Sequence, residues 1–410
     1  MKIDEGFLAQ MREATRLLQS EGPMAATAAI QRALHGAGAA DNTNVPPDWT
    51  GFLPKTPEPQ DINPPHAPKV EPGVQPDGGV RERIGKFSRK WADAMARHAV
   101  EDVEVKDAVD LAGKGRYLSG SCTSHAGTRA YKLYIPSSYT GQALPLVVML
   151  HGCTQHPDDF AAGTCMNAVA EDSNCFVVYP AQTKSANASN CWNWFNTSDQ
   201  RRDHGEPAII ADITRAIISE YGIDANRVYV AGLSAGGAMA AVMGATYPDL
   251  YAAIGIHSGL PYAVAHDMPS AFAAMKNRKV KASARKATVK PASPLGHTMP
   301  VIVFHGDRDA TVDPSNSDQA LAQCVASPGA RPGSDANVKI EDGTAPNGRT
   351  YTRTIVHDAQ GKVVAEKWIV HGAGHAWSGG SGNGSYTDPK GPDATREMLR
   401  FFYTHERKAT

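Results

Sequence analysis

One serine of this sequence lies in a setting that favours nucleophilic catalysis. Ser234 is the central residue of the pentapeptide GLSAG, which has the form GxSxG. The apolar run RVYVA precedes it and the helix-forming run GGAMAAVMGA follows it. A serine on a sharp turn between a strand and a helix is exposed at the end of a sheet, and glycines at 232 and 236 would let that turn pass close to its neighbours. Ser234 is therefore the predicted nucleophile, and an ordinary Gly/Ser turn is the alternative.

A serine hydroxyl needs a base, and the base is oriented by an acid. In hydrolases with a GxSxG turn the acid follows the serine along the chain and the histidine comes last. The run 301–304 predicts a strand downstream of Ser234, and it is followed by HGDRD. Asp309 is the predicted acid, because about two turns of chain are needed before a carboxylate can reach back to the histidine. Asp307 is its competitor, Asp313 a third candidate, and turn-forming aspartates are the alternative.

The histidine is expected after the last predicted strand. Residues 363–370 form that apolar run, and HGAGHAW follows it. His375 is the predicted base, because it stands at the far end of the glycine-containing loop and next to an aromatic residue. His371 is instead expected to cap the strand or to form hydrogen bonds within the loop.

An oxyanion in acyl transfer is stabilised by backbone N–H groups. The predicted donors are Ala235, directly after the nucleophile, and Cys153, in the loop that follows the apolar run 144–150. The side chain of Cys153 is interpreted as structural. Cys191 precedes an aromatic cluster that is expected near the same pocket, so a Cys153–Cys191 disulfide is a hypothesis. None of the six cysteines forms a CxxC pair, which argues against zinc and thioredoxin-type sites.

Alternating apolar runs and helical patterns from about residue 115 predict an α/β fold. Near-continuous apolar runs are typical of strands buried on both faces of a sheet, and strands alternating with helices predict a doubly wound, mostly parallel sheet. The expected strands are 129–136, 144–150, 176–179, 227–231, 252–257 and 301–304, with a hairpin of 351–357 and 363–370, and the expected helices are 206–220, 236–246 and 393–405.

The first 114 residues differ in composition and pattern from the rest of the chain. Residues 1–44 predict a short helical segment, 45–80 a proline-rich linker, and 81–114 an amphipathic helix with a connector, before a catalytic domain over 115–410. The helix at 81–100 is expected to pack on the main domain, with surface binding as the alternative. A basic stretch at 276–290 is interpreted as a solvated loop, with a lid or anion-attracting rim as the alternative.

Composition narrows the classes of partner. Lys and Arg total 41 against 42 Asp and Glu, so no global charge favours nucleic acid or an anionic membrane. No apolar run approaches the roughly 18 residues of a membrane-spanning helix. The expected chemistry requires neither metal nor organic cofactor. The N-terminus mixes charges and has no apolar core typical of a secretion signal, which favours the cytoplasm.

Six ordered motifs resemble one esterase family. They are LHGCTQ at 150–155, CWNWF at 191–195, GLSAGGAM at 232–239, IHSGLPY at 256–262, HGDRD at 305–309 and HGAGHAWSGG at 371–380. Together they resemble the extracellular polyhydroxybutyrate depolymerases, a family that also includes feruloyl and acetylxylan esterases. The resemblance covers about residues 115–405.

The resemblance implies an α/β-hydrolase fold and hydrolysis of carboxylic esters. It assigns the triad roles to Ser234, Asp309 and His375, and it places Trp194, Trp377 and His257 among the residues expected at the substrate. A polyhydroxyalkanoate or its oligomers is the expected substrate, and feruloyl or acetyl esters of carbohydrates are the runner-up. Family members are usually secreted, so the compartment is left open, as is the oligomeric state. The rival from another class is a non-catalytic protein that coats polymer granules through its N-terminal helices.

Overall fold

A computed structural model describes residues 115–276, 295, 297–325, 337–346 and 348–407. The segments predicted for 1–44, 45–80 and 81–114 lie outside the described residues, as does the basic stretch beyond Lys276. Their predictions remain untested.

A ten-stranded sheet organises the described part of the chain, in the order β1-β2-β4-β3-β5-β6-β7-β10-β9-β8. The six central strands, from β4 to β10 in this order, pair in parallel. Two further strands pair antiparallel at each edge, β1 and β2 at one and β9 and β8 at the other. The strands are β1 (Arg116–Ser124), β2 (Gly127–Ile135), β3 (Leu146–Leu150), β4 (Phe176–Pro180), β5 (Val228–Leu233), β6 (Ala253–His257), β7 (Val301–Gly306), β8 (Asn337–Thr344), β9 (Thr350–His357) and β10 (Val363–Val370). A separate parallel pair joins β11 (Trp377–Ser378) to β12 (Thr387–Asp388).

The central strands are apolar throughout because helices cover both faces of the sheet. Successive side chains of a strand point to opposite faces. On β3, Val148 and Leu150 belong to one buried cluster, whereas Val147 and Met149 belong to a second cluster. The continuous run of apolar residues therefore reflects two cores rather than one.

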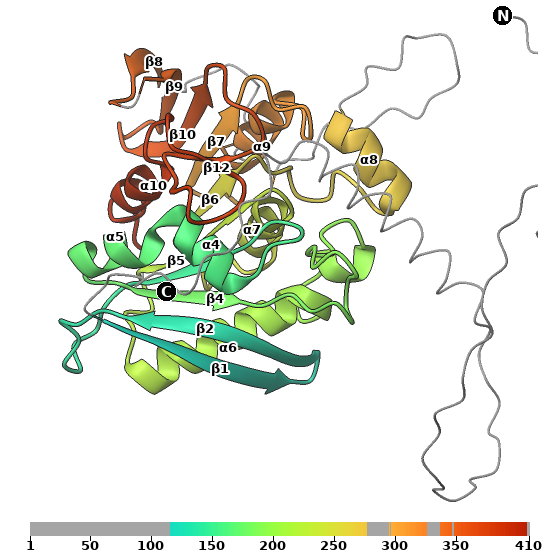
Figure 1. Cartoon of the computed structure of the whole chain (residues 1–410), viewed down its shortest axis with the longest axis vertical. Coiled ribbons are helices and arrows are strands. Elements are labelled where there is room, and N and C mark those ends of the chain that lie inside the picture. Colours follow the sequence, from blue (N-terminus) through green and yellow to red (C-terminus); the bar gives the residue numbers. More distant parts are fainter. Residues whose placement is uncertain (1–114, 277–294, 296, 326–336, 347, 408–410) are drawn as a thin grey trace, which may run out of the picture. The chain divides into compact units, whose positions relative to one another are not determined.

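Helices from different parts of the chain supply those two cores (Figure 1). The cluster that contains Leu150 includes residues of α6 (Gly205–Tyr221), α7 (Ala235–Thr246), α8 (Met268–Lys276) and α9 (Ser315–Val325). The cluster on the opposite face includes residues of α4 (Pro157–Thr164), α5 (Met166–Ser173) and α10 (Ala394–Phe402). A short 3-10 helix, η1 (Thr197–Gln200), precedes α6.

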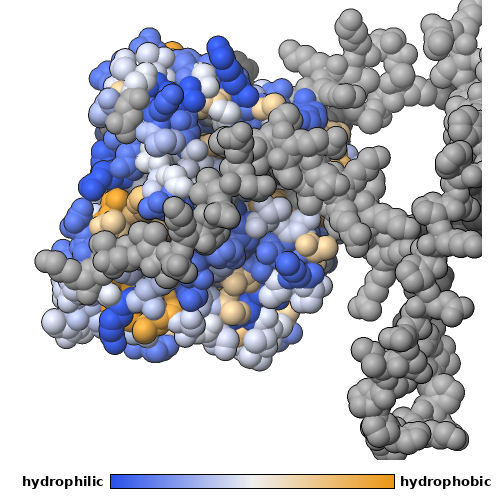
Figure 2. All heavy atoms as spheres, in the orientation of Figure 1, coloured by the Kyte–Doolittle hydropathy of each residue, from blue (hydrophilic) through white to orange (hydrophobic). Residues whose placement is uncertain are grey.

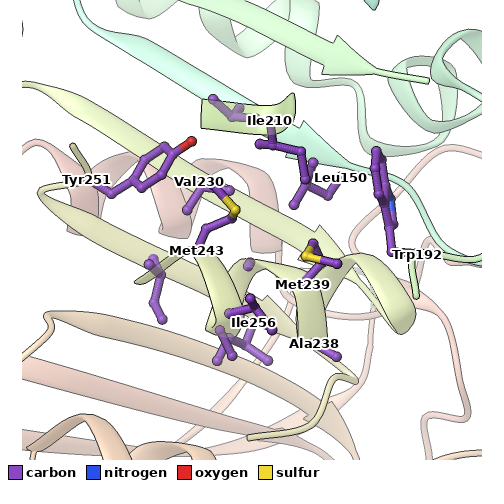
Figure 3. Packing of buried hydrophobic residues seen from close by; sticks show 14 of the residues in the cluster. Leu150, Trp192, Ile210, Val230, Ala238, Met239, Met243, Tyr251 and Ile256 are labelled. Carbon is purple, nitrogen blue, oxygen red and sulfur yellow. The ribbon is translucent and has the colours of Figure 1, made fainter. Parts of the chain in front are cut away.

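Helix α7 crosses the middle of the larger cluster and is apolar all round. Met239 and Met243 are fully buried, and Figure 3 shows them packed with Val230 of β5 and Ile256 of β6. Because the N-terminus of this helix carries Ser234, the packing of α7 fixes where the serine lies.

The predicted doubly wound sheet is confirmed, including the β9–β10 hairpin and the helices corresponding to α6, α7 and α10. The edge strands β1 and β8 and the helices α4, α5, α8 and α9 were not predicted. The sequence of β1, RYLSGSCTS, has few apolar residues and alternates between exposed and partly buried positions. An edge strand half in water lacks the apolar run by which the central strands are recognised.

The face of the molecule in Figure 2 is mostly hydrophilic, with small separate hydrophobic patches. The large apolar side chains that are exposed include Val338 and Ile340 of β8. Within the described residues, no helix combines the length and the apolar character that crossing a membrane requires.

Two isoleucines offer a matched test of this core. Ile213 on α6 is fully buried, whereas Ile340 on β8 is 66% exposed. Ile213→Ala should lower the free energy of unfolding by about 2–5 kcal/mol, because it leaves a cavity in the larger cluster. Ile340→Ala should change it by at most about 0.5 kcal/mol. Denaturant unfolding followed by circular dichroism measures both, and equal effects of the two substitutions would contradict the described packing.

Candidate active site

Ser234 occupies a strained turn between β5 and α7. Its φ of 57° and ψ of −117° are unusual for a residue with a side chain, a conformation that costs on the order of 1–3 kcal/mol. The Ser234 N–H donates to His257 O at 2.8 Å, which fixes the turn against β6. A Cβ atom at Gly236 would collide with the backbone of Leu150, and one at Gly232 would collide with Gly236. The two glycines of the pentapeptide are thus required by close backbone approach.

The structure brings Asp309 and His375 together across two loops. The Nδ1 atom of His375 lies 2.7 Å from Asp309 Oδ2, and the aspartate side chain is fully buried. Because a carboxylate only accepts, Nδ1 carries a proton and donates it, so in the neutral form of the ring Nε2 is the nitrogen that can accept a proton.

Asp309 is held by hydrogen bonds on both oxygens. Oδ1 accepts from Thr311 N at 2.8 Å and from Val312 N at 2.9 Å. Oδ2 also lies 3.1 Å from His305 Nε2. Burial alone would raise the pKa of Asp309, but the nearby His375 and the hydrogen bonds from His305 and His375 outweigh it and hold the pKa well below its usual range. Asp309 is therefore ionised at neutral pH.

The competing candidates, Asp307 and His371, pair with each other. His371 Nδ1 lies 3.0 Å from Asp307 Oδ2, and the other oxygen accepts from Gly372 N at 2.7 Å. Both side chains are more than one-third exposed. Asp313, the third candidate, accepts from Ser315 N at 3.0 Å at the start of α9. These contacts give the three residues structural partners away from Ser234.

A small cavity joins Ser234 to His375. Its lining residues are Gly152, Cys153, Gln155, Leu233, Ser234, His375 and Tyr386. Within the described residues no hydrogen bond connects Ser234 Oγ to the imidazole of His375. Hydrogen bonds between catalytic groups are often long in the free enzyme and shorten when substrate binds. Shared access to one cavity is therefore the observed relation between the two side chains.

The loop after β3 leaves one backbone donor open at this cavity. Gly152 N donates to Gln155 Oε1 at 2.9 Å, and Thr154 N donates to Ser189 O at 2.7 Å. Cys153 N, between them, has no hydrogen-bond partner in the described part of the chain. Ala235 N is the first N–H of α7, where a helix lacks an internal acceptor, and it likewise has no partner among these residues. Both predicted oxyanion donors are free to bind a ligand oxygen.

The hypothesised disulfide is confirmed. Cys153 and Cys191 are bonded, with their Cα atoms 4.2 Å apart, and the other four cysteines are free thiols. The bond ties the loop after β3 to the aromatic cluster that begins at Trp192.

The predicted substrate-binding residues lie outside the cavity lining. Trp194 is buried and packs edge-on against Phe195. Trp377 is buried, and its indole N–H donates to Thr395 Oγ1 at 3.0 Å. The substrate role of Trp194 and Trp377 remains a prediction, and the burial of both side chains does not support it.

His257, the third residue of that set, is also buried. It stacks on Trp377, and its Nε2 accepts from Ser378 N at 2.9 Å. Burial lowers the pKa of His257 well below its usual value. These contacts make it a neutral support beneath the segment that follows His375, and its substrate role too remains a prediction.

Sequence reasoning missed three residues of the site. Tyr386 lines the cavity, and its hydroxyl lies 3.1 Å from Thr154 Oγ1. Gln155 accepts from Gly152 N and donates to Asp159 Oδ2 at 3.0 Å. His305 contacts the carboxylate of Asp309. Gln155 and His305 stand inside recognisable motifs, whereas Tyr386 follows a glycine-rich run without any such signal.

No group of three or more His, Cys, Asp or Glu side chains suited to a metal ion occurs among the described residues.

The sheet, the strained serine turn and the Asp–His pair at the carboxyl ends of its strands define the α/β-hydrolase fold. The model of the family described as Esterase PHB depolymerase matches residues 129–337. The chain belongs to this family, whose members are carboxylic ester hydrolases.

Two relatives agree with that assignment, and one solved structure shares the fold. The chain is 32% identical over 255 residues to poly(3-hydroxyalkanoate) depolymerase C of Paucimonas lemoignei, covering 62% of this chain and 59% of that protein. It is 32% identical over 259 residues to a poly(3-hydroxybutyrate) depolymerase of Ralstonia pickettii, covering 59% of this chain and 50% of that protein. The chain thus spans between half and three-fifths of the length of these relatives. An acetyl xylan esterase from Aspergillus awamori shares the fold at a TM-score of 0.53 and 19% identity, over 70% of this chain and 99% of that one.

The disulfide makes a prediction about thiol counts. The purified chain, unfolded in guanidinium without reductant, should titrate four thiols with Ellman's reagent, and six after reduction, because Cys153 and Cys191 are bonded. Cys191→Ser serves as the control and should show five thiols under both conditions. Six reactive thiols in the unreduced wild type would contradict the bond.

Proposed function

We propose that this protein is a serine esterase that cleaves polyhydroxyalkanoate chains or their oligomers through an acyl-enzyme. The observation that carries the proposal is the 2.7 Å contact between His375 Nδ1 and the buried Asp309 carboxylate, with Ser234 in the same cavity. An oriented neutral imidazole beside a serine on a strained turn is the arrangement that activates a hydroxyl.

The first half-reaction transfers the acyl group to Ser234. His375 Nε2 takes the hydroxyl proton as Ser234 Oγ attacks the ester carbonyl carbon. The carbonyl oxygen becomes an oxyanion that accepts hydrogen bonds from Cys153 N and Ala235 N. When this intermediate collapses, His375 gives the proton to the departing alcohol oxygen and the acyl-enzyme remains.

The second half-reaction repeats these steps with water. His375 removes a proton from the water, whose oxygen attacks the acyl carbon, and then returns the proton to Ser234 as the acid leaves. Asp309 stays ionised throughout because its pKa lies below its usual range. Its charge therefore stabilises the imidazolium that forms twice in each cycle.

The polyester substrate is supported by the names of the two bacterial relatives, both of which are depolymerases of poly(3-hydroxyalkanoates). Feruloyl and acetyl esters contain the same carboxylic ester bond, and the triad alone does not select among these acyl groups. Hydrolysis of 3-hydroxybutyrate trimers, methyl ferulate and acetylated xylan by the same preparation should therefore be compared. The hydroxybutyrate trimer should give the highest kcat/KM, and preference for either of the others would overturn the substrate proposal.

The nucleophile is tested by Ser234→Ala. The kcat for p-nitrophenyl butyrate should fall roughly 10³-fold or more, because no other group forms the acyl-enzyme. Ser270→Ala on α8, outside the cavity lining, is the matched control and should retain wild-type turnover. A Ser234→Ala enzyme with most of its activity would exclude the proposed role.

The two aspartates after β7 offer a paired test of the acid. Asp309→Asn should reduce kcat roughly 10⁴-fold, because the amide stabilises the wrong tautomer of the histidine and cannot offset its charge. Asp307→Asn, which loses only the exposed contact to His371, should reduce kcat less than about tenfold. The assignment is wrong if Asp307→Asn proves the more damaging of the two.

A further inference from the structure

A buried carboxylate lies behind the oxyanion loop, outside the cavity. Glu206, in the first turn of α6, is 4% exposed. Its Oε2 accepts from Asn193 N at 2.7 Å, and its Oε1 accepts from Asn193 Nδ2 at 2.7 Å and from Gln182 Nε2. Arg129 approaches Oε1 at 3.9 Å. Every one of these neighbours is a donor, so the site is shaped for a carboxylate with two accepting oxygens.

One chain of hydrogen bonds runs from Glu206 through Gln182 to the loop after β3. Gln182 N donates to His151 Nε2 at 3.1 Å. Because Nε2 accepts, the ring proton is on Nδ1, which donates to Gly152 O at 2.8 Å. Burial lowers the pKa of His151 to about 4, which keeps the ring in this neutral form. The peptide unit held by His151 is the one whose N–H belongs to Cys153.

A second chain runs from Glu206 through the aromatic segment. Gln182 Nε2 also donates to Cys191 O at 2.9 Å, and Asn193, two residues further on, is held through both its N–H and its side chain. Cys191 is bonded to Cys153. The two chains therefore meet at Cys153, one through the backbone and the other through the disulfide.

We propose that Glu206 is a positioning residue that aims Cys153 N at the reacting carbonyl oxygen. The inference rests on the proposed function, since it assumes that Cys153 N is an oxyanion donor. The peptide plane between Gly152 and Cys153 is held at its oxygen by His151 and beside its nitrogen by the disulfide. Through Gln182, Glu206 is linked to His151, which holds the oxygen of this peptide, and to Cys191, which forms the disulfide. A donor displaced by a fraction of an ångström stabilises the transition state less while binding of the ester changes little.

The protonation state of Glu206 changes near neutral pH. Burial, and next the nearby Asp199, raise the pKa of Glu206 to about 7, while hydrogen bonds from Asn193 and Gln182 oppose the shift. Asp199 also accepts from Glu206 N at 2.8 Å and so holds the start of α6.

The test is Glu206→Gln, which keeps the size of the side chain but presents an NH₂ group to donors. The kcat for p-nitrophenyl butyrate should fall about 10–100-fold, with KM within about twofold of wild type. The control is Glu366→Gln on β10, another buried carboxylate, which accepts from Arg353 and Arg400. It loses comparable hydrogen bonds without contacting the oxyanion loop and should keep kcat within about threefold.

A second variant guards against failure of the first to fold. Gln182→Met fills a similar volume and removes the three side-chain bonds of Gln182, to Glu206, Cys191 O and Thr183 N, while it leaves the backbone bond to His151. It should also lower kcat with little change in KM. All rates are divided by the folded fraction from near-ultraviolet circular dichroism. The inference is overturned if kcat per folded molecule stays within twofold of wild type in the variants that fold, or if only KM changes. Ser234→Ala measured alongside separates the two claims, because an active Ser234→Ala enzyme refutes the proposed function itself.

Discussion

The proposed chemistry depends first on the hydrogen bond between Asp309 and His375, and the surrounding structure holds these two residues in place. It joins the loops after β7 and β10, which are neighbouring parallel strands and so end at the same edge of the sheet. The loops are also joined by their backbones, since Asp307 N donates to Val370 O and Arg308 N to Ala373 O. Parallel strands thus deliver an acid and a base from positions 66 residues apart to one place, and β5 delivers the serine to the same edge.

The strained turn at Ser234 packs closely against the end of β3. The turn is possible because glycines at 232 and 236 let Leu150 approach, and Leu150 is also the last residue before the oxyanion loop. The close packing of β3, β5 and α7 therefore sets the distance between Ser234 and Cys153, the proposed nucleophile and the proposed oxyanion donor. In the proposed account, the disulfide and the hydrogen bonds around Glu206 hold Cys153, so the orientation of the loop after β3 depends on buried polar groups as well as on apolar packing.

The sequence predicted those parts of the fold and of the candidate site that depend on residues close together in the chain. Continuous apolar runs predicted the central strands, and the GxSxG motif with its flanking runs predicted the turn between β5 and α7 that carries Ser234. Tyr386 and Glu206 could not be found in this way, because their roles come from contacts between segments that only the tertiary fold brings together. Trp377 and His257 were expected at the substrate because they lie in or near motifs. Proximity to a motif does not determine the direction of a side chain, and both side chains are buried in the core beneath the loop that carries His375.

The central claim is that His375 makes the hydroxyl of Ser234 nucleophilic. Its most direct test is labelling by a fluorophosphonate, which bonds to an activated serine, with the modified peptide located by mass spectrometry. The account predicts a single adduct on the peptide containing Ser234 in the wild-type chain, and almost no labelling in His375→Ala. An adduct on another serine, or equal labelling of Ser234 with and without the imidazole, would contradict it.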